Sequence, residues 1–186
     1  MKYEDITTPQ ELLEWMYNIT YGYQGKTKLY KYDDENFNED WFDEYVLEEP
    51  TSLIKTKVGN CWDQTELERY WFTSHNYKVK TIYEMVNLPY ENPYPTHSFL
   101  IYQDENNNWN WFENSDLNNR GIHTKQTEKE LIEYQLTKYK NFLQTFNISS
   151  TELEKIVIKE FEKPKANCSA EEYINHVLNS KDYKGE

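Results

Sequence analysis

The chain has 186 residues, a length that one compact domain accounts for, so we expect a single domain over residues 1–186. Its 33 acidic and 20 basic residues give a net charge near -13, which would repel a phosphate backbone and argues against nucleic acid as a partner. No apolar run reaches the roughly 20 residues of a membrane span, and the N-terminal residues lack the basic and apolar regions of a signal peptide. These features predict a cytoplasmic protein, and aromatic residues, at 17%, are expected to form much of its core.

Helix signals come first along the chain. Thr8, Pro9 and Glu11 predict the start of an amphipathic helix, because they supply a hydroxyl cap, an N1 proline and an acidic first turn. The acidic and aromatic segment 33–50 is interpreted as a solvated acidic face, with a flexible lid or an irregular helix as the alternatives. The stretch after it carries the strongest signals.

Residues 61–74 have the composition of a largely buried helix, in which Trp62, Leu67, Tyr70 and Trp71 recur at helical spacing. Apolar runs and turn residues then predict three strands, the last two paired as a hairpin through an Asn-rich turn: 77–86, 96–103 and 109–115. Two capped helices enclose a further strand, in the order 127–144, 153–161 and 169–179. The order of these elements predicts an α+β fold with helices packed on a mostly antiparallel sheet.

Cys61 is the residue at which the sequence points to chemistry. It lies in the first turn of the predicted helix, where unpaired backbone N–H groups and the helix dipole favour a thiolate over a thiol. Gly59 is expected to provide a flexible turn before it, and the Cys61 backbone N–H can face a developing oxyanion. Asp63 and Glu66 place negative charge on the same turns and oppose the thiolate, so a cationic neighbour has to decide the outcome.

His97 is the candidate for that cationic neighbour. It begins an apolar strand, and an imidazolium beside a thiolate forms an ion pair that later protonates the leaving group. A carboxylate on the adjacent hairpin strand can hold the other ring nitrogen, and Glu113 and Asp116 are the two candidates. Strand alternation places Trp109, Trp111 and Glu113 on one face, which favours Glu113.

The run VGNCWDQTELERYWF, around Cys61, resembles the G-x-C-W motif of transglutaminase-like proteins, and HSFLIYQDENNNWNWFENSD resembles their histidine strand, turn, tryptophan and acid. The family pattern places the acid about sixteen residues after the histidine, which is Glu113 here. Most members carry aspartate in that role, which keeps Asp116 as the alternative. WFENSD followed by RGIH also resembles small transglutaminase-like proteins of Gram-positive bacteria and their phages, and the resemblance covers residues 55–125.

The resemblance implies a fold of the papain and transglutaminase type and an enzyme with Cys61 as nucleophile and His97 as base, completed by Glu113 or Asp116. Cys61 would attack a glutamine amide or a peptide carbonyl and form a thioester, which an amine converts to a cross-link and water to a deamidated or cleaved product. The expected partners are a protein or peptide substrate and, for cross-linking, an amine acceptor. The alternative is an inactive binding protein of the same fold, in which Cys61 is unreactive.

The negative charge suits a basic or neutral peptide, a polyamine or a lysine-bearing surface as the partner. Four potential zinc ligands are scattered singly along the chain: Cys61, His97, His123 and Cys168. No phosphate-binding glycine loop and no EF-hand loop appears, so we expect chemistry without a metal or a cofactor. Two cysteines without an export signal are expected to remain free thiols.

Trp62 and either Trp109 or Trp111 are expected to line the cleft, and the other aromatic residues are expected to lie in the core.

Overall fold

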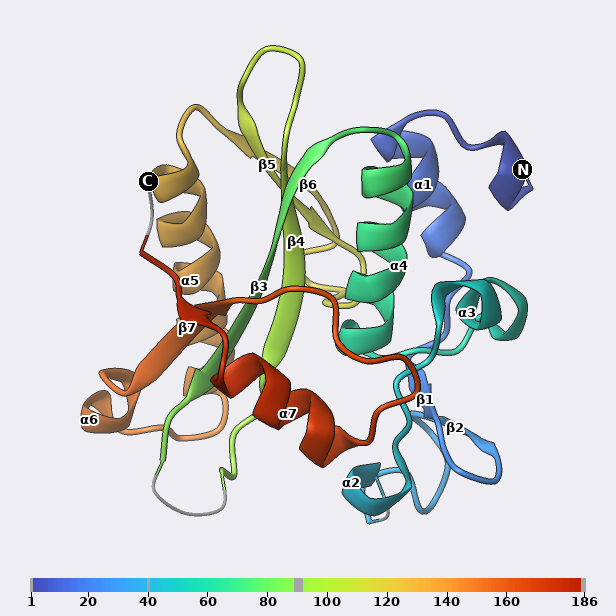
Figure 1. Ribbon diagram of the computed structural model, residues 1–186. Coiled ribbons are helices and arrows are strands. Elements are labelled where there is room, and N and C mark those ends of the chain that lie inside the picture. Colours follow the sequence, from blue (N-terminus) through green and yellow to red (C-terminus); the bar gives the residue numbers. More distant parts are fainter. Residues whose placement is uncertain (1, 40, 89–91, 185–186) are drawn as a thin grey trace.

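The computed structural model describes residues 2–39, 41–88 and 92–184, and it has a mixed α+β fold built on a six-stranded antiparallel sheet (Figure 1). The strand order across the sheet is β6-β5-β4-β3-β7-β8. These strands are β3 (Lys78–Val86), β4 (His97–Gln103), β5 (Trp109–Glu113), β6 (Gly121–Lys125), β7 (Ile156–Glu160) and β8 (Lys181–Asp182). A two-stranded hairpin, β1 (Gly22–Gln24) and β2 (Leu29–Lys31), precedes them in the chain.

Helices cover both faces of the sheet, as Figure 1 shows. The two that matter for the site are α4 (Cys61–Ser74) on one face and α5 (Glu128–Gln144) on the other. Side chains alternate along each strand, so Leu100 and Phe112 pack toward α4 while Phe99 and Trp111 pack toward α5. The remaining helices are η1 (Tyr3–Asp5), α1 (Pro9–Met16), α2 (Trp41–Glu44), α3 (Pro50–Thr56), α6 (Ser150–Leu153) and α7 (Ala170–Leu178).

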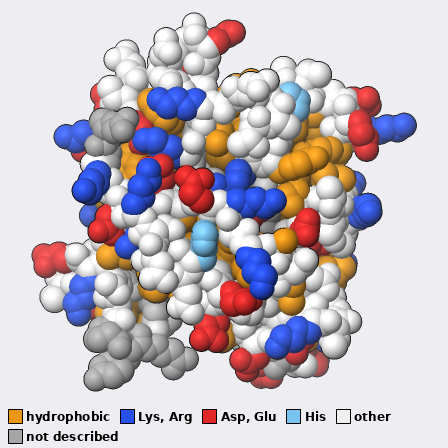
Figure 2. Space-filling view, viewed as in Figure 1, with side chains coloured by type: hydrophobic (Ala, Val, Ile, Leu, Met, Phe, Trp, Pro, Cys, Tyr) orange, Lys and Arg blue, Asp and Glu red, His pale blue; other side chains and the backbone are white. Residues whose placement is uncertain are grey.

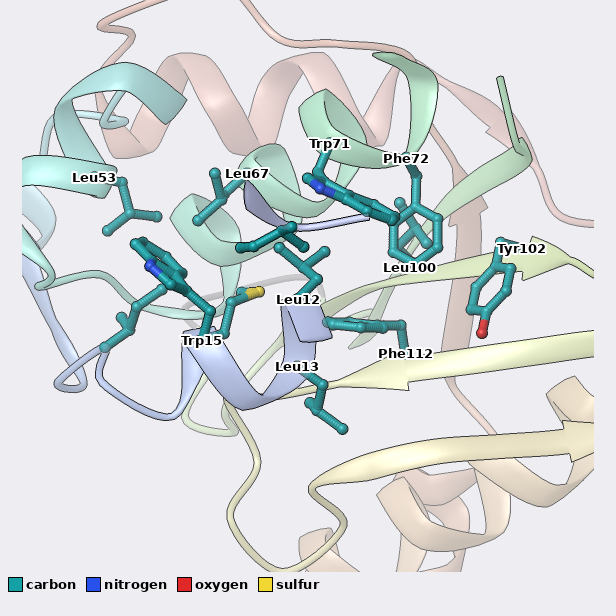
Figure 3. Packing of buried hydrophobic residues seen from close by; sticks show 13 residues of the cluster. Leu12, Leu13, Trp15, Leu53, Leu67, Trp71, Phe72, Leu100, Tyr102 and Phe112 are labelled. Atoms are coloured by element: carbon teal, nitrogen blue, oxygen red, sulfur yellow. The ribbon is translucent and has the colours of Figure 1, made fainter. Parts of the chain in front are cut away.

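The core between α1, α4 and the sheet is built from aliphatic and aromatic side chains (Figure 3). Its fully buried members include Leu67 and Phe72 of α4, which meet Leu100 and Phe112 of the sheet. Burying a side chain of this size stabilises the fold by about 1.5–3 kcal/mol. This packing holds α4, and with it Cys61, in a defined place on the sheet.

The helices and strands expected from the sequence are present with shifted ends, and several elements were not anticipated. Thr8, Thr127 and Ser169 each cap a helix through a capping box. The unanticipated elements are short: η1, β1, β2, β6, β8, α3 and α6. Tyr70 corrects the predicted buried face of α4, because it is 46% exposed while its neighbour Trp71 turns into the core.

The described part of segment 33–50 consists of turns, α2 and an extended stretch, and Asp40 lies outside the described residues. Carboxylates such as Asp33 and Glu35 are exposed, whereas Tyr45, Leu47 and the carboxylate residue Glu48 are buried. The early part of the segment is therefore a solvated acidic surface, and its last residues anchor it in the fold.

Acidic and basic side chains are interspersed over the face shown in Figure 2, with small apolar patches between them. Within the residues that the structure describes, no helix is both long enough and apolar enough to cross a lipid bilayer.

Candidate active site

Cys61 is the first residue of α4, and the cap that precedes it sets its position. The Asn60 side chain accepts hydrogen bonds from the backbone N–H groups of Trp62 and Asp63, at 2.9 and 3.3 Å. The Asp63 carboxylate in turn accepts the Asn60 N–H at 3.0 Å, which completes a capping box. Cys61 thus begins the helix at the end where the dipole favours negative charge.

Gly59 is required for space rather than for the backbone flexibility that was expected of it. Among the described glycines, only Gly121 has a positive φ. A Cβ at position 59 would lie 2.8 Å from Leu53 Cδ1 and 3.0 Å from Asp63 Cβ. The absence of a side chain at Gly59 therefore lets the loop before Cys61 pack closely against α3 and α4.

Two hydroxyl groups join the first turn of α4 to the strand that carries His97. Thr65 Oγ1 donates to the Cys61 carbonyl at 2.7 Å, and Ser98 Oγ donates to the same oxygen at 3.1 Å. The two hydroxyls are 3.0 Å apart. Because Ser98 directly follows His97, this network sets Cys61 against the start of β4.

An amide pair makes the equivalent connection to the strand that carries Glu113. Asn114 Nδ2 donates to Gln64 Oε1 at 2.6 Å, and Gln64 Nε2 donates to the Gly59 carbonyl at 2.9 Å. Asn114 follows Glu113 in the chain and is fully buried. The helix, the histidine strand and the acid strand are therefore linked by buried hydrogen bonds.

Glu113 is the carboxylate that contacts the His97 ring. His97 Nε2 and Glu113 Oε2 are 2.8 Å apart. The other Glu113 oxygen accepts the Ser115 hydroxyl at 2.9 Å and the Asp116 backbone N–H at 2.8 Å. The Asp116 carboxylate serves its own turn instead, where it accepts from Asn119 at 2.7 Å. Of the two candidate acids, the structure brings Glu113 to the imidazole.

The Cys61 side chain interacts with the His97 ring and contributes to the raised pKa of this histidine, and because Nε2 faces Glu113, Nδ1 is the ring nitrogen left for the sulfur. Burial by itself would lower the pKa of His97, but the Glu113 charge and the Cys61 contact outweigh it and raise that pKa well above its ordinary value. Burial would likewise raise the pKa of Glu113, yet His97 and the hydrogen bonds to Glu113 hold it below its usual range. The Glu113 carboxylate and the Cys61 side chain therefore both favour the protonated form of the imidazole.

The two acids expected to oppose the thiolate are engaged elsewhere. Burial raises the pKa of Asp63 to about 7, even though hydrogen bonds from Tyr45 and Asn60 act against the shift. Glu66 forms an ion pair with Arg69 at 3.1 Å. His97, whose raised pKa favours its protonated form, is the neighbour placed to supply the positive charge expected from the sequence.

A cavity of about 400 Å³ lies beside Cys61 and His97. Its walls are mostly aromatic or aliphatic, and Trp111 is one of them. The other two tryptophans assigned to the cleft lie outside this lining. Trp62 stacks on Tyr173 with ring centroids 4.2 Å apart, and Trp109 is buried on the α5 face of the sheet. Both are core residues, because their apolar area is covered by the packing of the fold.

Tyr21 is a site residue that the sequence reasoning missed. It lines the same cavity as Cys61 although the residue is 38% exposed, and burial of the hydroxyl together with its interaction with Cys61 raises its pKa well above the ordinary value. The residue before it is tied to the Cys61 loop: Thr20 N–H donates to the Lys57 carbonyl at 2.9 Å, and its carbonyl accepts the Gly59 N–H at 3.1 Å. Forty positions separate Tyr21 from Cys61, so no local motif announces the contact.

The backbone N–H of Cys61 has no acceptor within the described part of the chain, unlike those of Trp62 and Asp63. Both cysteine thiols, Cys61 and Cys168, are free. Among the described residues, no group of three or more His, Cys, Asp or Glu side chains is arranged to hold a metal ion. The chemical resources of the site are therefore a thiol, an imidazolium, a carboxylate, a phenol and an unpaired amide.

Comparison with known proteins finds no matching family model, no similar curated protein and no similar solved structure. Function has therefore to be inferred from the geometry of the site itself.

Proposed function

We propose that the protein is a cysteine-dependent acyl-transfer enzyme of the transglutaminase-like kind, with Cys61 as nucleophile, His97 as general base and acid, and Glu113 orienting the imidazole. The observation that carries this proposal is the continuous contact from Cys61 through His97 to Glu113 at the wall of a cavity. A nucleophile bonded to a base that a third group orients is the arrangement used in covalent acyl transfer.

The reaction starts from a Cys61 thiolate and a His97 imidazolium. The sulfur attacks the carbonyl carbon of a glutamine amide or a peptide bond, and a C–S bond forms. The C–N bond then breaks as the His97 proton passes to the leaving nitrogen, so ammonia or an amine departs and a thioester remains. His97 next takes a proton from water or an amine, which attacks the thioester and releases the sulfur. Glu113 stabilises the imidazolium throughout.

Two donors are available for the oxyanion of the tetrahedral intermediate: the Cys61 N–H and the Tyr21 hydroxyl. The sulfur loses its negative charge when it attacks, which frees the phenol to turn toward the new oxyanion. Because the pKa of Tyr21 is raised by burial and by Cys61, the phenol stays protonated and remains a donor at neutral and moderately alkaline pH. Removal of one such donor costs about 10²–10³ in rate in other acyl-transfer enzymes.

Alkylation of the free enzyme by iodoacetamide near neutral pH tests the activation of Cys61. We expect fast labelling of Cys61 in the wild type, because the His97 imidazolium stabilises the thiolate. His97→Ala should slow labelling by at least about tenfold, whereas Cys168→Ala should label at the wild-type rate. Peptide mapping by mass spectrometry assigns the label. Labelling of Cys168 alone would refute the proposal and favour the inactive binding protein.

A second readout follows the covalent step. p-Nitrophenyl acetate should acetylate Cys61 with a burst of p-nitrophenol, and the thioester should be detected on the Cys61 peptide. If iodoacetamide labels Cys61 but p-nitrophenyl acetate forms no thioester on it, the thiol is activated without carrying out acyl transfer. That result would contradict the proposed reaction.

A further inference from the structure

Resting on the proposed function, we propose that the cavity beside Cys61 is a specificity subsite for a substrate side chain with an aliphatic stem and a terminal primary ammonium, of the lysine type. Glu84 and Gln135 form its polar end. Glu84 lies on β3 directly opposite His97 of β4, and Gln135 comes from α5. Both side chains are buried, and both line the cavity.

The hydrogen bonding of this pair is incomplete in a way that specifies a donor. Gln135 Nε2 donates to Glu84 Oε1 at 2.6 Å, which leaves Glu84 Oε2 and Gln135 Oε1 without a partner among the described residues. Gln135 Oε1 is an acceptor, and Glu84 Oε2 is an acceptor when the carboxyl group is ionised. A buried acceptor left unpaired is destabilising, and a primary ammonium brings three N–H donors. Such a ligand would satisfy both oxygens at once.

The rest of the cavity suits the stem of such a side chain. Pro95, Trp111, Tyr139 and Phe142 supply apolar and aromatic walls. The Tyr139 hydroxyl is already bonded to the Pro95 carbonyl at 2.7 Å, so it adds no competing polar group. Lysine buries its methylene groups against apolar surface, and aromatic faces attract its ammonium. The volume of about 400 Å³ lies within the range of small-ligand sites.

Charged groups of both signs line the cavity. Asp116 and the ionised form of Glu84 are negative, whereas Lys138 and the protonated form of His97 are positive, and the Lys138 ammonium lies 5.2 Å from the centroid of the Tyr134 ring. Burial raises the pKa of Glu84 to about 8, an effect that His97 and Gln135 reduce. An ammonium beside Glu84 favours the ionised form of its carboxyl group, so binding of the ligand is expected to lower the pKa of Glu84 and release its proton.

Other ligand classes fit less well. A carboxylate in this position would be repelled by the Glu84 carboxylate at pH values above the Glu84 pKa of about 8. A purely aliphatic side chain would fill the walls and leave both acceptors unpaired.

The test compares three acyl donors, the p-nitrophenyl esters of Nα-acetyl-lysine, Nα-acetyl-norleucine and Nα-acetyl-glutamine. Norleucine keeps the aliphatic stem without the ammonium, and glutamine offers neutral N–H donors. At pH 8 we expect kcat/KM for the lysine ester to exceed that for the norleucine ester by about tenfold or more. In Glu84→Gln, this lysine-to-norleucine ratio should fall to about one, because the neutral amide cannot pair with the ammonium.

Gln135→Met is the second variant, because it removes the other acceptor while keeping a similar length, and the ratio should fall there too. Lys138→Met removes the cation at the same cavity and should keep or raise the ratio. Turnover of the norleucine ester by each variant reports that it is folded. A wild-type ratio near one, or a ratio that both substitutions leave in place, overturns the subsite.

A wild-type preference for the glutamine ester over the other two also overturns the ammonium assignment, in favour of a neutral amide ligand. If no ester is turned over in a Cys61-dependent way, the proposed function itself fails. That result is distinct from an active enzyme without lysine preference.

Discussion

The surroundings of the two cysteines differ far more than their burial does. Cys61 is 7% exposed and Cys168 2%, and both belong to one apolar cluster. Burial, with the charge of Glu172, raises the pKa of Cys168 to about 11, so its thiol stays neutral at physiological pH. Cys61 instead has His97 and Tyr21 against its sulfur and a cavity beside it. Burial by itself is typical of an unreactive thiol. A reactive thiol is expected to have a charged neighbour and to be accessible from a cavity.

Replacing each sulfur in turn is the most direct test of the difference between the two cysteines. Cys61→Ser should lower acyl transfer to p-nitrophenyl acetate by at least about 10³, because His97 cannot hold a serine hydroxyl as the ionised nucleophile. Cys168→Ser should keep the activity and lose about 1–2 kcal/mol of unfolding free energy, since a hydroxyl replaces a buried thiol. Steady-state rates and urea denaturation measure the two effects. An equal loss of activity in both variants would contradict the expectation that Cys61 is the nucleophile and Cys168 is inert.

The acid behind His97 is the next point of difference. Glu113→Gln should lower kcat/KM by about 10²–10⁴, because an amide cannot orient the His97 ring and stabilise its imidazolium form as a carboxylate does. Asp116→Asn is the matched control on the same loop, and a change of only a few-fold is expected there. A larger loss of kcat/KM in Asp116→Asn than in Glu113→Gln would show that Asp116, and not Glu113, supports His97.

Tyr21→Phe separates thiol activation from oxyanion stabilisation. We expect acylation by p-nitrophenyl acetate to fall about 10²-fold, because one of two oxyanion donors is lost. Alkylation by iodoacetamide forms no oxyanion, so its rate should be retained or raised. Tyr70→Phe, on the exposed side of α4, controls for removal of a phenol. Equal slowing of both reactions would show that Tyr21 acts on the thiol and not on the oxyanion.

The smallest expected effect is on stability. The raised pKa of His97 contributes stability that is present below its unfolded value near 6.5 and is lost as pH rises through the folded value. The lowered pKa of Glu113 contributes stability that is present above about 4.3 and is lost as pH falls through the folded value. The pair is therefore fully effective between roughly pH 4.5 and 6.5.

Glu113→Gln should accordingly lose about 2 kcal/mol of unfolding free energy at pH 5.5 and less at pH 9.5. Urea denaturation of the variant and the wild type at both pH values measures the difference. A loss that grows toward alkaline pH would contradict the ion pair.

Local physics explains which parts were predictable from the sequence. Thr8, Thr127 and Ser169 cap helices through residues three positions away, so each signal is contained in a few letters. Strand alternation also carried information, because it placed Glu113 on a face that Asp116 does not share. The catalytic roles of Cys61 and His97 stay predictions, although the structure brings the two side chains into contact.

The misassigned residues share a different cause. Trp62 and Trp109 lie at sequence positions that flank the site, yet the packing of α7 and α5 covers them, and sequence spacing cannot report which helix will arrive there. The assignment of Gly59 to a flexible turn failed for a related reason. Its constraint comes from Leu53 and Asp63, and only close packing reveals it.

The sequence by itself determined the helix that begins at Cys61, the strand that begins at His97 and the kind of chemistry that a thiol and an imidazole can share. Each of these depends on neighbours within a few positions or on residue type alone. The tertiary structure decided that Tyr21 reaches the same sulfur and that Glu84 and Gln135 meet beside it. Those contacts join segments about 40 to 50 positions apart, and their energies arise only once the sheet and α5 have closed around one cavity.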